Sequence, residues 1–65
     1  MTPLSSSNLA GCDYDAERQI LIILFRSGRT YRYADVPQQI ADGLTSASSP
    51  GQYFNSAVKG VYDET

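Results

Sequence analysis

The sequence predicts an α+β domain: a three-stranded antiparallel β-meander followed by two short helices that pack on one face of the sheet. Residues 19–33 read QILIILFRSGRTYRY, an apolar run rich in isoleucine, a turn containing Gly28, and then tyrosines at alternate positions. This pattern is typical of a β-hairpin, because side chains alternate between the two faces along a strand. Beyond residue 36 the apolar residues recur every three or four positions, which is the period of an amphipathic helix. The predicted order of elements is therefore β-β-β-α-α.

The register of the hairpin decides where its tyrosines point. A two-residue loop would place Leu24 opposite Tyr31, whereas a three-residue loop closed by a bulged Gly28 would place Ile23 opposite Tyr31. We favour the longer loop, because Ser-Gly is a natural end for a type I turn followed by a glycine bulge. This register places five apolar or aromatic side chains on one face: Leu21, Ile23, Phe25, Tyr31 and Tyr33. A slip of one residue would move all of them to the other face.

The remaining elements follow from local patterns. The expected strands are residues 8–14, 18–26 and 29–33, and Cys12 on the first of them is expected to be a small core residue rather than a nucleophile. Pro37 opens a helix over residues 37–47, since proline fixes φ and lacks an N–H that the first helical turn leaves unpaired. A second helix is expected over residues 50–59, after a capping box formed by Ser49 and Gln52.

These elements make one domain over residues 6–62, with residues 1–5 disordered and residues 63–65 frayed. The helices should cover the face of the sheet that carries the larger apolar side chains. The expected core consists of Leu21, Ile23, Phe25, Ile40, Leu44, Phe54 and Val58.

Composition excludes several classes of function. The chain has 65 residues, a single cysteine and no histidine, so an internal disulfide is excluded and a zinc site would have only carboxylates besides Cys12. The N-terminus lacks the basic start and apolar core of a signal peptide, and the run at residues 20–25 is far shorter than the roughly 20 apolar residues that span a bilayer. We therefore expect a cytoplasmic protein with no cofactor, no metal and no membrane contact.

The charge pattern is uneven. A net charge of −2 argues against indiscriminate binding to nucleic acid. However, Arg26, Arg29 and Arg32 all lie at the end of the hairpin, while most of the nearby acidic residues precede the apolar run. Solvated loops that balance each other's charge would explain this pattern equally well.

A series of short motifs between residues 7 and 62 carries a family resemblance. They are Ser7-Asn8, Tyr14-Asp15, Leu21, Ile23, Phe25, Ser27-Gly28, Tyr31-Arg32-Tyr33, Val36-Pro37, Leu44, Ser49, Gly51, Tyr53, Phe54, Asn55, Lys59 and Tyr62. In this order they resemble the KTSC domain, in a stand-alone bacterial or phage form, and the resemblance covers residues 6–62. That family takes its name from the C-terminus of some lysyl-tRNA synthetases, and its fusion to them suggests RNA binding. Two residues depart from the family pattern: Cys12 replaces a larger aliphatic residue, and Pro50 replaces a basic residue whose phosphate contact is thereby less expected.

Two classes of binding function stay open. Tyr31 and Tyr33 could stack on bases of RNA or another single-stranded nucleic acid, with arginines on the phosphates. The full set of candidate residues is Tyr31, Arg32, Tyr33, Arg26, Arg29, Asn55 and Lys59. In the preferred register, however, both tyrosines turn toward the helices and could be core residues. The alternative is another protein, or a second copy of this chain, bound at a sheet edge or on the apolar face that carries Ile20, Ile22 and Leu24.

An enzyme is not expected. The sequence has no histidine, no paired carboxylates on rigid elements, and no glycine-rich loop with a lysine that could cradle a phosphate.

Overall fold

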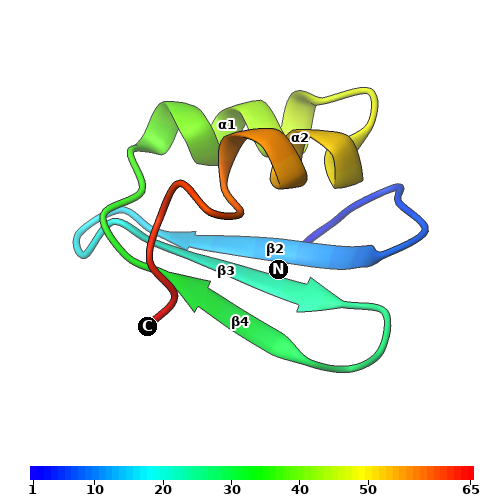
Figure 1. The fold of residues 1–65 in the computed structure, drawn as a ribbon, viewed down its shortest axis with the longest axis horizontal. Coiled ribbons are helices and arrows are strands. Elements are labelled where there is room, and N and C mark those ends of the chain that lie inside the picture. Colours follow the sequence, from blue (N-terminus) through cyan, green and yellow to red (C-terminus); the bar gives the residue numbers. More distant parts are fainter.

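A computed structural model describes residues 1–65 as a four-stranded antiparallel sheet with two helices on one of its faces (Figure 1). The strands lie in the order of the chain. The elements are β1 (Thr2–Pro3), β2 (Leu9–Asp15), β3 (Ile20–Phe25), β4 (Thr30–Tyr33), α1 (Gln38–Ser46) and α2 (Pro50–Ala57). The α+β class and the helical pair agree with the sequence prediction, and the number of strands does not.

The hairpin between β3 and β4 has the predicted longer loop. Ile23 lies opposite Tyr31, and the Phe25 N–H donates to the Arg29 carbonyl at 2.8 Å across the turn. Gly28 has a φ of 93°, a conformation that glycine adopts without the steric cost of a Cβ. The side chains of Leu21, Ile23, Phe25, Tyr31 and Tyr33 therefore share the face of the sheet that the helices cover.

The two ends of the chain correct the prediction of three strands with loose termini. Thr2–Pro3 pairs with β2, and Leu4 is only 6% exposed in the core. Pro3 is compatible with this place because an edge strand does not need every N–H. At the other end, residues 63–65 pair with the outer edge of β4 through a bridge between Tyr33 and Glu64 (Figure 1). Pairings this short leave no periodic pattern in a sequence, which is why neither end was predicted.

The core lies between the sheet and the two helices. Five of the seven expected core residues are buried, and the other two, Phe25 and Ile40, are partly buried against them. Six other hydrophobic residues belong to the core: Leu4, Leu9, Cys12, Tyr33, Val36 and Ala41. Cys12 is 3% exposed, in agreement with its predicted place in the core.

The helix ends also differ in detail. Pro37 is the N-cap of α1 rather than its first residue, so the helix is shorter than predicted. Ser49 caps α2 without a side-chain hydrogen bond, and the predicted capping box with Gln52 is wrong. The Ser49 carbonyl instead accepts the Tyr53 N–H at 3.0 Å. Neither helix is long and apolar enough to cross a membrane.

Candidate functional site

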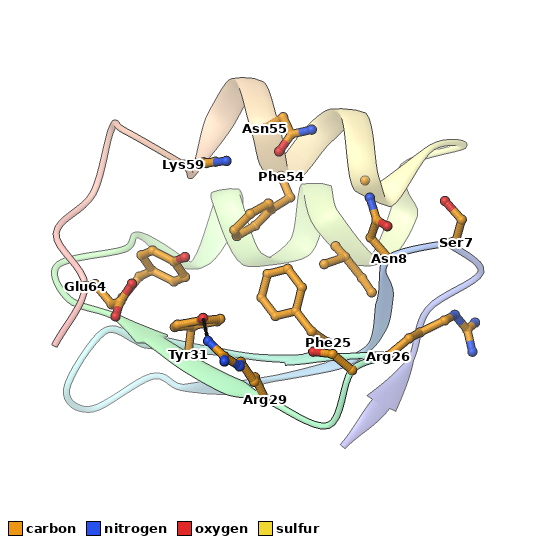
Figure 2. A pocket seen from close by; sticks show the side chains of 14 residues that line it. Ser7, Asn8, Phe25, Arg26, Arg29, Tyr31, Phe54, Asn55, Lys59 and Glu64 are labelled. Atoms are coloured by element: carbon orange, nitrogen blue, oxygen red, sulfur yellow. Dashed lines mark hydrogen bonds between the residues drawn. The ribbon is translucent and has the colours of Figure 1, made fainter.

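An open cleft of about 690 Å³ lies between the end of the hairpin, the turn before β2, and α2 (Figure 2). Fourteen side chains from separate parts of the chain line it. They are Ser7, Asn8, Leu9, Phe25, Arg26, Ser27, Arg29, Tyr31, Tyr33, Gly51, Phe54, Asn55, Lys59 and Glu64.

Four aromatic rings form the floor of the cleft. Phe25, Tyr31 and Tyr33 come from the inner face of the hairpin, and Phe54 descends from α2 between them (Figure 2). The rings meet edge to face: Phe25 lies 5.2 Å from Tyr31 and 5.6 Å from Phe54, centroid to centroid. Tyr33 lies 5.7 Å from Phe54. Edge-to-face contacts stabilise such a cluster beyond the burial of area. Phe25 and Tyr31 are only partly buried, so the floor is partly open to solvent.

Two cations lie on opposite sides of this floor. Arg29 lies in the turn just before β4, and Lys59 follows α2 (Figure 2). The Arg29 Nη1 donates to the Tyr31 hydroxyl at 3.4 Å, which raises the pKa of Arg29. The Lys59 ammonium makes no hydrogen bond or ion pair within the chain. Both groups are therefore free to contact an anionic ligand.

Arg26 has a different role, although it also lines the cleft. Its Nε donates to the Ser6 carbonyl, and its Nη2 donates to the Leu4 carbonyl at 3.5 Å. The guanidinium thus points toward the N-terminal loop and away from the aromatic floor (Figure 2). Arg26 holds the loop in place rather than offering its donors to a ligand.

That loop presents Ser7 and Asn8 at one end of the cleft. The Ser6 Oγ accepts the N–H groups of Asn8 and Leu9 at 3.2 and 3.3 Å, and this closes a tight turn. A side chain at Gly51 would meet the same Oγ at 3.2 Å, so glycine there lets α2 approach the turn closely. The Asn8 amide and Ser7 hydroxyl are left without partners in the chain and face the cleft (Figure 2).

The cleft is basic although the whole chain is acidic. Three of the five basic residues and only one of the seven acidic residues line it. That acidic residue is Glu64, from the C-terminal segment that pairs with β4. The pKa of Tyr33 is raised, mainly by burial and to a smaller extent by the electrostatic effects of Glu64 and Tyr31. Its hydroxyl therefore keeps its proton at neutral pH.

Six of the seven residues proposed from the sequence line this cleft, and Arg32 does not. Arg32 faces the opposite side of the sheet, beside Ile22, because side chains alternate along a strand. Tyr33 is 7% exposed, so it is a core residue whose edge reaches the site. Phe25, Phe54 and Glu64 also line the cleft but were not among the site residues proposed from the sequence. Phe25 could have been proposed, because in the preferred register it shares a face of the sheet with Tyr31 and Tyr33. The short pairing that places Glu64 leaves no pattern in the sequence.

No group of three or more cysteine, aspartate or glutamate side chains is arranged so that it could hold a metal ion. The site consists of aromatic rings, three basic side chains, the carboxylate of Glu64 and uncharged hydrogen-bonding groups.

Together, fold and site define a small α+β domain with a basic, aromatic-floored cleft. The chain belongs to the KTSC domain family, whose model matches residues 5–62. A KTSC domain protein of Yersinia pestis has the same fold, with a TM-score of 0.93 and 34% identity over 98% of this chain and 90% of that one.

Relatives occur both as small proteins and as part of a larger one. A protein of Tsukamurella paurometabola is 41% identical over 59 residues, which cover 91% of this chain and 88% of the relative. A lysine–tRNA ligase of Nostoc punctiforme is 41% identical over 49 residues, which cover 75% of this chain but only 9% of the ligase. The chain is thus related to a small region of that ligase.

Proposed function

We propose that this chain is a binding module for single-stranded nucleic acid, RNA in particular, and that the cleft is its binding site. The observation that carries the proposal is the placement of Arg29 and Lys59 on two sides of an aromatic floor in a chain whose net charge is −2. Phosphates attract such cations, and the exposed edges of Tyr31 and Phe25 offer a surface for a base or ribose ring.

The surrounding groups suit a ligand that is polar as well as flat. Asn8 and Asn55 each offer an amide that can both donate and accept, and Ser7 and Ser27 offer hydroxyls. Unpaired bases present hydrogen-bonding edges that such groups can contact, whereas a duplex hides them. The similarity to a region of lysine–tRNA ligases, whose name refers to tRNA, also supports an RNA partner.

The test is the salt dependence of binding to an oligouridylate of about ten nucleotides, followed by fluorescence anisotropy. Two phosphate contacts predict that log affinity falls with log salt at a slope of about −1.4, from about −0.7 per contact. The double substitution Arg29→Gln with Lys59→Gln should weaken binding and bring the slope close to zero.

A matched control keeps the net charge of that variant but removes cations outside the cleft. Arg18→Gln with Arg32→Gln makes the same change in charge, and neither residue lines the cleft. This control should keep nearly the wild-type slope. Equal losses in the two double variants, or no salt-sensitive binding at about 50 mM salt, would show that the cleft is not a nucleic-acid site.

A second candidate is a contact with another protein on the face of the sheet that no helix covers (Figure 1). Ile20, Ile22 and Leu24 lie side by side along β3 on that face and are only partly buried. Ile22→Lys would abolish such a contact and leave RNA binding unchanged. Sedimentation of the wild-type protein and of this variant, each with and without RNA, therefore separates a protein contact from RNA binding.

A further inference from the structure

Glu64 is the one acidic side chain of the cleft, and the backbone fixes its place. The Thr65 N–H donates to the Arg32 carbonyl at 2.7 Å, and the Ala34 N–H donates to the Asp63 carbonyl at 2.9 Å. These two bonds flank the Tyr33–Glu64 pair, which makes it the closer, non-hydrogen-bonded kind of antiparallel pair. Side chains that are directly opposite in such a pair share a face, so Glu64 lies beside Tyr33 at one end of the cleft (Figure 2).

The chemistry of Glu64 differs from that of every other polar group in the cleft. Arg29 and Lys59 only donate hydrogen bonds, whereas the hydroxyl and amide side chains both donate and accept. An ionised carboxylate only accepts. A ligand that fits the whole cleft therefore carries anionic groups toward the two cations and a hydrogen-bond donor toward Glu64.

This inference rests on the proposed function and specifies its ligand. We propose that Glu64 accepts a hydrogen bond from a ribose 2′-hydroxyl, and that the cleft therefore prefers RNA to DNA. The 2′-hydroxyl is the donor that distinguishes the two nucleic acids, and a carboxylate is a known kind of partner for it in nucleotide sites. Without such a contact, Glu64 would only repel phosphates and would weaken the binding of both RNA and DNA.

The experiment compares three probes of one sequence: oligouridylate, the corresponding deoxyuridine oligonucleotide, and a 2′-fluoro oligouridylate. The 2′-fluoro probe keeps the sugar conformation of RNA but has no donor at the 2′ position. Wild-type protein should bind RNA about tenfold or more tightly than either of the other two probes, as expected for a hydrogen bond to a charged group. In Glu64→Ala that ratio should fall to about one, and binding of the deoxyuridine probe should become tighter because a negative charge is lost.

Asp63→Ala is the matched control. It removes the same charge from the neighbouring residue, which does not line the cleft, and it keeps the Asp63 carbonyl that accepts the Ala34 N–H. This variant should keep the wild-type ratio of RNA to DNA affinity, and circular dichroism checks that both variants are folded.

Three results would overturn the inference. Wild-type protein could bind all three probes equally, Glu64→Ala could tighten all of them by the same factor, or Asp63→Ala could lower the ratio as much as Glu64→Ala. Each of these leaves the nucleic-acid proposal standing. If wild-type protein binds none of the probes, the proposed function itself is wrong, and the inference with it.

Discussion

Two arginines three positions apart show how a single turn assigns different roles. Arg26 directly follows β3 and donates to backbone carbonyls of the N-terminal loop, so it supports the loop at one end of the cleft. Arg29 directly precedes β4, and its side chain donates to the Tyr31 hydroxyl. The sequence grouped both with Arg32 as one basic cluster, because spacing along the chain does not show on which side of a hairpin each side chain lies.

At the same scale, Cys12 and Tyr33 predict how stability depends on pH. Burial raises the pKa of both above their ordinary values of 9.0 and 10.0. The unfolded chain therefore loses these protons at lower pH than the folded chain does, and rising pH favours unfolding. Stability from these groups should be constant below about pH 9 and should fall above it.

The urea midpoint at about pH 7, 9 and 10.5 measures this effect. Cys12→Ala should make the alkaline decline shallower, since it removes one of the two groups and leaves Tyr33 in place. A midpoint that is unchanged up to about pH 10.5, or an equal decline in Cys12→Ala, would mean that the thiol is not the buried neutral group described above.

Among the elements, the hairpin was predictable and the outer pairings were not. The Ser27-Gly28 turn indicated the register of β3 and β4, and the helical period located α1 and α2. The edge strand Thr2–Pro3 and the pairing of residues 63–65 depend on contacts with strands distant in sequence. Each of these pairings involves only one or two residue pairs, which is too few to leave a periodic pattern of apolar residues in the sequence.

The contact between α1 and α2 depends on Gly43, although glycine is a weak helix former. Tyr53 of α2 crosses over Gly43 and donates its hydroxyl to the Ile40 carbonyl at 2.9 Å. A Cβ at position 43 would overlap that tyrosine ring and its oxygen. Helix propensity alone would favour alanine over glycine by about 1 kcal/mol.

We therefore expect Gly43→Ala to destabilise the protein by about 1–3 kcal/mol, as overpacking does, despite its better helix propensity. Ser46→Ala in the same helix is the control, because Ser46 is exposed and its loss should be nearly neutral. Chemical denaturation of both variants gives the comparison. A stabilised Gly43→Ala would show that Tyr53 does not pack on α1 in this way.

For the molecule as a whole, the core and the candidate site share side chains. Phe54 is 4% exposed, contacts the rings of Phe25 and Tyr33, and also lines the cleft. The expected core list contained five of the eleven buried core residues, and the sequence indicated the three basic residues and two of the four aromatic residues of the cleft. The sequence could not predict that the core and the cleft share side chains, because this depends on where α2 crosses the sheet.

Phe54→Ala should cost about 3–5 kcal/mol, since it removes a buried ring at the centre of this cluster. That is a large part of the stability of so small a domain. Val61→Ala is the control, because Val61 is 61% exposed and should change stability by less than about 0.5 kcal/mol. Cooperative unfolding of Phe54→Ala at nearly the wild-type midpoint would contradict the packing described above.

The location of bound RNA on the molecule tests the central claim most directly. Titration of the ¹⁵N-labelled protein with the oligouridylate, followed by amide chemical shifts, reports every part of the surface at once. We predict the largest changes at residues around the cleft, namely Asn8, Arg29, Tyr31, Asn55 and Glu64, with saturation at one common affinity. Asp13 and Ile22, on the face that no helix covers, should shift little. Changes confined to that face, with the cleft amides unaffected, would contradict the account.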